Sequence, residues 1–219
     1  MMIKGVLNMS GQQSNQTHQN MQTGAVPQQL NHGAREILAV TDALGASIDT
    51  MNQFLIFRQH VKGQELLGIL DRQYKFMQDE YNITVECFQS GKDPSKPTGE
   101  YKMQMDNDFV YGLKPGQPKK PFQSIGEISD EYVGARLLGA LKAGTNAKVV
   151  AATESTNPVV RRVFADSIPN CIEMAYEVSI FLNKNGFYHI PQFPEQDAQQ
   201  LLNGFAVATE QPQMPPNKQ

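Results

Sequence analysis

The sequence predicts an all-α fold, a four-helix bundle built from two antiparallel helix hairpins that a long crossover joins. Two observations predict it. In four stretches of about 26 residues, apolar residues recur every three or four positions, which is the period of one helix face. Between the second and third stretches, a 37-residue segment (90–126) is too rich in proline and glycine to form a long helix.

The first predicted hairpin comprises residues 33–61 and 64–89, separated by Lys62-Gly63. Because this break is so short, the two helices must fold back on each other. Glu80 lies on the apolar face of the second helix, and we expect Lys142 or Lys148 to pair with it, since a buried carboxylate needs a partner. The residues predicted to face the core are Ile37, Val40, Leu44, Ile48, Met51 and Leu55, then Leu66, Ile69, Leu70, Met77, Thr84 and Phe88.

The second predicted hairpin comprises residues 128–155 and 158–185. Asn157 is the expected N-cap of the fourth helix, Pro158 its first residue, and Gly186 its left-handed exit. Pro169 lies inside this helix and is expected to kink it. The predicted core residues are Leu137, Leu141, Gly144 and Ala151, then Phe164, Ile168, Cys171, Ala175, Val178 and Leu182.

The crossover determines how the hairpins combine. A helix of about 26 residues is about 39 Å long, and 37 residues span that height even when only partly extended. The second and third helices therefore run parallel, which is the one-crossover topology of ferritin-like bundles. We predict a ferritin-like four-helix bundle over residues 32–191.

The ends of the chain have a different composition. The chain contains 23 Gln and 14 Asn, many of them near its ends, while charged residues are 19% of the whole. Residues 1–31 are rich in Gln, Asn, Ser and Thr and are expected to be a disordered arm, because they cannot bury enough apolar surface. Residues 192–219 are expected to be a tail with one short amphipathic helical turn, followed by a Pro- and Gln-rich end.

Charge and hydropathy exclude several partners. A net charge of −3, with Lys119-Lys120 as the longest basic run, argues against nucleic acid. No window approaches about 18 apolar residues, so no membrane partner is expected. Cys87 and Cys171 lie far apart on apolar faces and are predicted to be buried free thiols.

No catalytic, cofactor-binding or metal site is predicted. Di-iron ferritin-like proteins use Glu-x-x-His motifs, and this sequence contains none. Glu173 of the nearest substitute, Glu173-x-x-Tyr176, falls opposite the core stripe of its helix. An alternative class is a ferritin-like metal-binding or redox protein with non-standard ligands such as Glu80 and Asp49. A further alternative is a binding module whose pocket Pro169 opens or the crossover covers.

The second hairpin carries a recognisable set of residues. They are Lys142, then Glu154-Ser-Thr-Asn157-Pro158-Val-Val-Arg161 across the turn, and Asn183-Lys-Asn-Gly186-Phe-Tyr188 at the end. Over residues 130–191 the chain resembles the spore coat protein F family (Coat F domain). The resemblance implies a structural, non-enzymatic component of the bacterial spore coat, whose partners are other coat proteins and itself. It also implies synthesis in the mother-cell cytoplasm without a secretion signal.

Within this resemblance, the motif residues are expected to have structural roles. Lys142, Glu154, Arg161 and Arg162 are expected to gather around the turn between the third and fourth helices, as solvated residues. Cross-linking is a further expectation: isopeptide bonds through the Gln-rich arms near Lys4 and Lys218, and oxidative coupling of exposed Tyr101, Tyr111 and Tyr188.

Overall fold

The computed structural model describes residues 32–209, 212 and 215. The predicted arm 1–31 lies outside the described residues. The elements in chain order are α2 (Ala34–Arg58), α3 (Gln64–Ser90), the 3₁₀ helix η1 (Ile125–Glu127), α4 (Asp130–Glu154), α5 (Pro158–Lys184) and α6 (Glu195–Leu202). The described part of the chain has no strand, only isolated bridges that join Tyr111 and Gly112 to Ile190. The prediction of an all-α bundle is confirmed.

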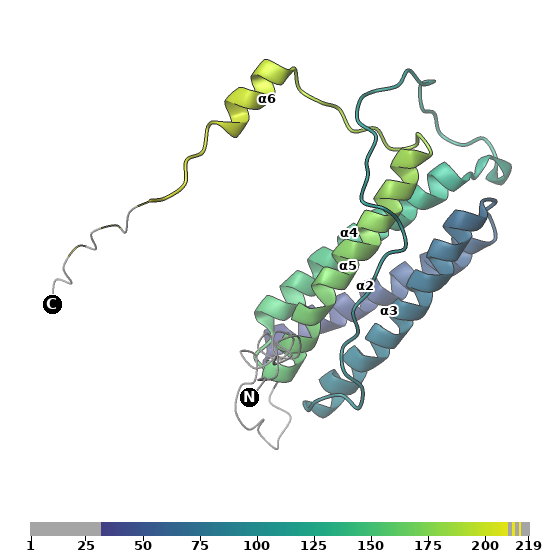
Figure 1. Cartoon of the computed structure of the whole chain (residues 1–219). Helices are drawn as coiled ribbons and strands as arrows, with labels where there is room; N and C mark the ends of the chain where they lie inside the picture. Colours follow the sequence, from purple (N-terminus) through teal and green to yellow (C-terminus); the bar gives the residue numbers. More distant parts are fainter. Residues whose placement is uncertain (1–31, 210–211, 213–214, 216–219) are drawn as a thin grey trace, which may run out of the picture.

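Contacts at the two ends of the bundle give the helix directions. The ring of His32, just before α2, contacts the carbonyl oxygen of Phe88 near the end of α3. The amide of Gly63, between α2 and α3, donates to the side chain of Asp130 at the start of α4. Thus α2 is antiparallel to α3, and α3 and α4 begin at the same end and run parallel (Figure 1). The likeness to ferritin-like bundles stays a prediction.

The core consists of two apolar clusters between the four long helices. In α4, Gly134 allows close approach to α5, because a Cβ there would lie 2.7 Å from Cδ2 of Leu182. The larger cluster lies toward the end where α3 and α4 begin and includes Phe54, Leu66, Leu70, Leu137, Met174 and Phe181. The smaller cluster lies toward the opposite end and includes Val40, Cys87, Ala151, Val160, Val163 and Phe164.

The predicted core face of the first helix is wrong in part. Ile37, Ile48 and Leu55 are 44%, 41% and 62% exposed. The buried face of α2 instead consists of Glu36, Val40, Ala43, Thr50, Met51 and Phe54. This face is rotated from the predicted one because small and polar residues fill the side that meets α3 and α4. A prediction from the large apolar residues alone therefore chose the wrong side of α2 as its buried face.

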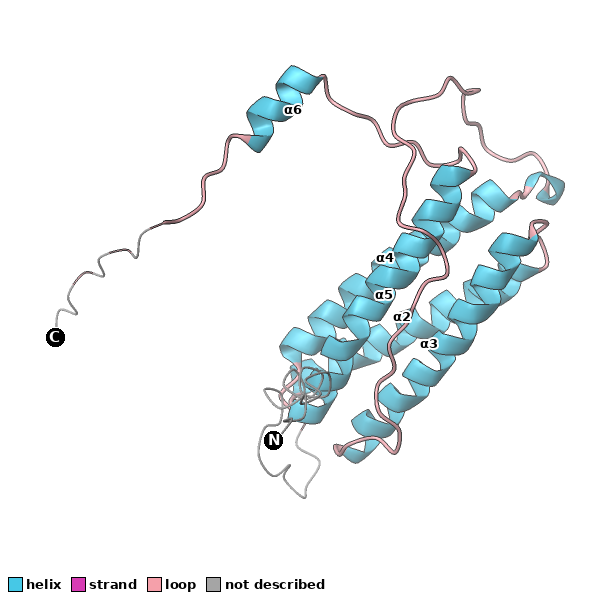
Figure 2. Cartoon of the chain, in the orientation of Figure 1, coloured by secondary structure: helices cyan, strands magenta, loops and turns pink. Residues whose placement is uncertain are grey.

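The crossover follows α5 along much of its length. It leaves α3 after Ser90 through Gly91, whose φ of 66° is left-handed. Figure 2 shows it as an extended loop running along the helices, with no helix of its own before η1. The helix α5 continues through Pro169 without interruption. After α5, the tail contains α6, in the segment where a short amphipathic turn is predicted.

Candidate functional site

The turn between α4 and α5 is organised by Asn157. Its Oδ1 accepts hydrogen bonds from the backbone amides of Val159 and Val160 at 2.9 and 3.2 Å, which caps α5. Its Nδ2 donates to the carbonyl oxygen of Gly91 at 3.1 Å. Pro158 is the first residue of α5, where its missing N–H costs nothing. The cap of α5 therefore also holds the end of α3.

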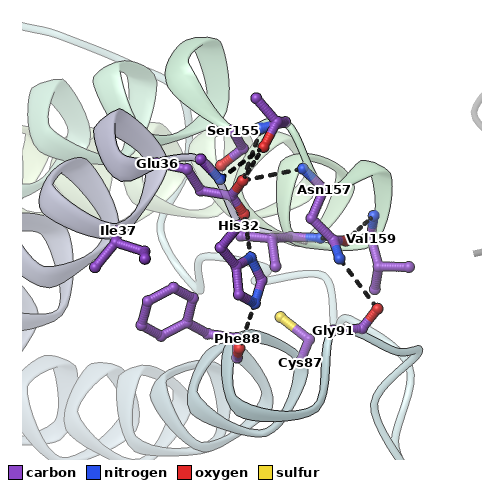
Figure 3. A network of polar contacts seen from close by, with 12 residues as sticks. His32, Glu36, Ile37, Cys87, Phe88, Gly91, Ser155, Asn157 and Val159 are labelled. Carbon is purple, nitrogen blue, oxygen red and sulfur yellow. Dashed lines mark hydrogen bonds and ion pairs between the residues drawn. The ribbon is translucent and has the colours of Figure 1, made fainter. Parts of the chain in front are cut away.

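Glu36 of α2 binds the same turn from the other side (Figure 3). Its side chain is fully buried. Oε2 accepts from the amide of Thr156 at 2.9 Å, the hydroxyl of Thr156 at 2.6 Å and the amide of Asn157 at 3.1 Å. Burial raises the pKa of Glu36, but the hydrogen bonds from Thr156, Asn157 and His32 outweigh it and hold the pKa below its ordinary value. Glu36 is thus a buried carboxylate whose charge is compensated locally.

His32 completes the connection to α3. Its Nδ1 lies 2.8 Å from Oε1 of Glu36, and its Nε2 lies 2.8 Å from the carbonyl oxygen of Phe88. Both neighbours accept hydrogen bonds, so the ring of His32 lies between two acceptors on different helices. We call His32, Glu36, Gly91, Thr156 and Asn157 the clasp. It ties the start of α2, the end of α3 and the α4–α5 turn together at one end of the bundle.

The other motif residues do not join the clasp. Glu154 forms a surface pair with Arg35 at 3.6 Å, and Arg161 is exposed. Lys142 does not gather at this turn as expected. Its Nζ lies 5.9 Å from the ring centroid of Tyr188. Tyr188 follows the C-terminal end of α5, the end away from this turn. The expectation fails because 12 residues of helix separate Lys142 from Glu154, about 18 Å at 1.5 Å per residue.

At that opposite end, Gly186 and Asn183 shape the exit from α5. Gly186 has a φ of 76°, the left-handed conformation expected of it. Sequence reasoning assigned no role to Asn183. Its Nδ2 donates to the carbonyl oxygens of Val110 and Tyr188, and its Oδ1 accepts from the amide of Val110. A buried Asn in the last turn of an apolar helix face is the signal that could have indicated this role.

Glu177 attaches the middle of the crossover to α5. It is fully buried and accepts hydrogen bonds from Arg72 at 2.6 Å, Gln73 at 3.0 Å, the amide of Gln104 at 2.9 Å and the hydroxyl of Tyr101. Burial and this carboxylate raise the pKa of Tyr101. The expectation that Tyr101 is exposed for oxidative coupling is therefore wrong, since the residue is only 7% exposed. Its ring is held in the core because its hydroxyl has a buried carboxylate to bind.

A buried ion pair connects α3 with α4. Glu80 pairs with Lys148, one of the two partners expected for it. Nζ of Lys148 also lies 3.2 Å from Sγ of Cys171 on α5. Burial lowers the pKa of Lys148, but Glu80 and Cys171 outweigh it and raise the pKa above its ordinary value. Nδ2 of Asn170 occupies the second oxygen of Glu80 at 3.1 Å.

Both cysteines are buried free thiols. Burial raises the pKa of Cys87 to about 12 and also raises that of Cys171. A protonated, buried thiol is a poor nucleophile and a poor metal ligand. Within the described residues, no group of three or more His, Cys, Asp or Glu side chains could hold a metal ion.

Two comparisons with known proteins give the family of this chain. A family model for the Coat F domain matches residues 129–191. The spore coat protein F-like protein YhcQ of Bacillus subtilis (strain 168) is 43% identical over 208 residues, which cover 94% of this chain and 95% of that protein. The chain belongs to the spore coat protein F family. No solved structure matches it.

Family membership places the chain among spore coat proteins. The Coat F match contains α4, α5 and the turn, hence Thr156 and Asn157 of the clasp, while His32, Glu36 and Gly91 come from outside it. The likeness to YhcQ extends well beyond the second hairpin, so the first hairpin shares more than architecture with the family. In the part of the chain that the structure describes, no helix has the length and apolar character needed to cross a bilayer.

Proposed function

We propose that this chain is a structural, non-enzymatic component of the bacterial spore coat, which assembles through contacts with other coat proteins and with copies of itself. Membership of the spore coat protein F family supports the location. The observation that carries the structural role is the clasp: the polar residues of the Coat F turn hold helices together. The Glu36 carboxylate is buried and engaged by three donors on one oxygen and by His32 on the other.

The other buried carboxylates have the same character. Glu80 is engaged by Lys148 and Asn170, and Glu177 by Arg72, Gln73 and Tyr101. General acid–base chemistry needs a group within reach of a substrate proton. The oxygens of these carboxylates instead accept hydrogen bonds from other residues of the bundle, which supports a structural role for them.

The alternative of a metal or redox protein using Glu80 and Asp49 gains no support from the geometry. Glu80 is buried against Lys148, whereas Asp49 is exposed on α2. A metal competing for Glu80 would have to displace an ammonium group that already neutralises it. Metal analysis of protein purified without chelator tests this alternative, and a stoichiometric metal would favour it.

The ends of the chain and two exposed tyrosines are proposed to make cross-links. Lys4 and Lys218 lie outside the described residues, and isopeptide bonds there stay a proposal. Tyr111 and Tyr188 are 60% and 40% exposed, which supports them as sites of oxidative coupling. Mass spectrometry of insoluble coat tests both proposals: recovery of every tail and tyrosine peptide unmodified would contradict them.

A fluorescent fusion imaged during sporulation tests the proposed function. We expect synthesis in the mother cell followed by a ring around the forespore. The fusion should stay with the coat fraction after the spore is stripped of soluble protein. A diffuse signal throughout the mother cell, with no ring, would overturn the proposal.

A further inference from the structure

The segment 191–209 carries apolar side chains that nothing in the described part of the chain covers. We call this C-terminal segment, as distinct from residues 1–31, the arm. The helix α6 has no buried residue and stands away from the bundle in Figure 1. Leu201, Leu202 and Phe205 are 59%, 72% and 90% exposed. Ala198, Leu201 and Leu202 occupy positions three or four apart and so share one face of α6, and Phe205 follows just beyond the end of the helix. An isolated helix of eight residues is marginal in water, so this face needs a surface to pack against.

A groove of suitable chemistry lies where the crossover returns to α4. It has a volume of about 470 Å³, within the size range of ligand sites. Its apolar part includes Phe122 and Tyr132, whose ring centroids are 4.7 Å apart, and Phe122 is 42% exposed. Its exposed cations include Lys120 and Arg136, which we call the rim cations. Glu131 also lines the groove, but Lys119 binds its carboxylate at 2.9 Å.

Charge favours this groove over two other exposed apolar surfaces, the row on α2 and the groove beside Tyr188. Between residues 191 and 209 the arm carries Glu195 and Asp197 and no Lys or Arg. The exposed apolar row of α2 has Asp42 and Asp49 beside it, which would repel an acidic helix. A larger groove beside Tyr188 has Lys142 as its cation, against two rim cations here. Opposite charge and matching apolar character therefore point to the groove at the start of α4.

The direction of the arm indicates which molecule supplies it. In Figure 1 the arm leaves the end of α5 and extends away from the side where η1 and the first turn of α4 lie. Ile190 is held by bridges to Tyr111 and Gly112, which fixes the point of departure. Pro191 and Pro194 restrict the backbone of the four residues that precede α6. An arm held in this way presents its apolar face to a neighbouring molecule.

We propose that the arm of one chain docks into this groove on a second copy of the chain. The apolar face of α6 covers Phe122 and Tyr132, and its acidic first turn lies against the rim cations. This inference rests on the proposed function, because it names the surface through which the coat protein assembles with itself. Arm and groove are different surfaces, so a reciprocated contact closes a dimer, whereas an unreciprocated one repeats into an open chain.

Charge reversal in the full-length protein tests the inference. Self-association is measured by analytical ultracentrifugation at about 0.15 M ionic strength, where surface charges still act within about 8 Å. We expect Glu195→Lys with Asp197→Lys to weaken association about tenfold, since two attractions become repulsions. Lys120→Glu with Arg136→Glu should weaken it equally. The chain carrying all four changes should regain most of the lost affinity, because its arm and groove are again opposite in charge.

A control matched to the groove reversal makes the same negative change in net charge elsewhere on the surface. Lys75 and Lys92 are exposed and do not line the groove, so Lys75→Glu with Lys92→Glu should associate like the wild type. Circular dichroism melts confirm that all variants fold. The inference is overturned if either reversal leaves association unchanged, or if the fourfold variant does not recover. It is also overturned if the wild type stays monomeric with its arm protected from protease by its own groove.

Failure of this inference is distinguishable from failure of the proposed function. A wild-type chain that does not self-associate, yet forms a ring on the forespore, overturns only the contact between arm and groove. A diffuse fusion overturns the coat function whatever the association state is. In the sporulating cell, the arm reversal should reduce ring intensity and the fourfold variant should restore it.

Discussion

Replacing Glu36 by alanine tests whether the clasp holds the bundle together. The carboxylate is fully buried and is the acceptor for the backbone amides of Thr156 and Asn157. Alanine leaves both amides without an acceptor, and an unsatisfied buried donor costs about 1–3 kcal/mol. The hydroxyl of Thr156 can turn elsewhere, and some water can enter the vacated space. We therefore expect a loss of about 3 kcal/mol in the free energy of unfolding.

Urea unfolding followed by circular dichroism measures this loss. For a protein of this size, about 3 kcal/mol corresponds to a fall of about 10 °C in Tm. Glu154→Ala is the matched control, because Glu154 is the last residue of α4, next to the same turn, but pairs with exposed Arg35 at 3.6 Å. Surface pairs contribute about 0–1 kcal/mol, so the control should stay near the wild type. A loss below about 1 kcal/mol in Glu36→Ala, or equal losses in both variants, would refute this reasoning.

Acid titration examines the same carboxylate independently. The pKa of Glu36 in the folded protein lies below its ordinary value of 4.5. The unfolded chain therefore binds the proton at a higher pH than the folded protein does. The contribution of Glu36 to stability is complete well above pH 4.5 and is lost as the pH falls through 4.5 toward the folded pKa. The stability difference between wild type and Glu36→Gln should shrink over that window, and a difference that grows on acidification would contradict the assignment.

The remaining predictions concern the interior and the crossover. Lys148→Met leaves the buried Glu80 carboxylate without its cation, and should lower the free energy of unfolding in urea by about 3–5 kcal/mol. Adding Glu80→Leu should recover much of that loss, since an apolar pair avoids the desolvation penalty. A double variant no more stable than Lys148→Met would contradict this. Asn183→Ala removes three hydrogen bonds that hold Val110 and the end of α5, so limited proteolysis should cut the crossover faster than in wild type, with the helical signal unchanged. Cys87 and Cys171 should resist a thiol reagent in the folded protein at neutral pH and react fully in denaturant, and rapid labelling of either in the native state would contradict their burial.

The bundle was predictable because its signals are local. Apolar spacing and the breaks at Lys62-Gly63 and Asn157-Pro158 placed the predicted helices within a few residues of α2, α3, α4 and α5. These patterns depend on residues a few positions apart. The buried face of α2 was harder to predict, because the side of a helix that is buried depends on its neighbours. Small residues such as Ala43 are buried there, while Leu55 faces solvent.

The same distinction between local signals and contacts distant in sequence holds for the candidate site. The capping role of Asn157 and the left-handed exit at Gly186 follow from bonds and dihedral angles within one helix end. The role of Glu36 does not, because most of its donors lie about 120 residues further along the chain. Tyr101 shows the same effect: its segment reads as a loop, but its hydroxyl reaches the buried carboxylate of Glu177.

The sequence by itself determined the helices, their caps, the crossover between them and the coat family, because each depends on short-range order or on a contiguous motif. Only the tertiary structure decided which polar side chains form buried contacts between helices and which apolar side chains remain on the surface. The physical reason is that a buried charge is tolerated only where partners from other elements meet it. Glu36 meets the α4–α5 turn in this way, whereas the apolar face of α6 meets nothing in the part of the chain that the structure describes.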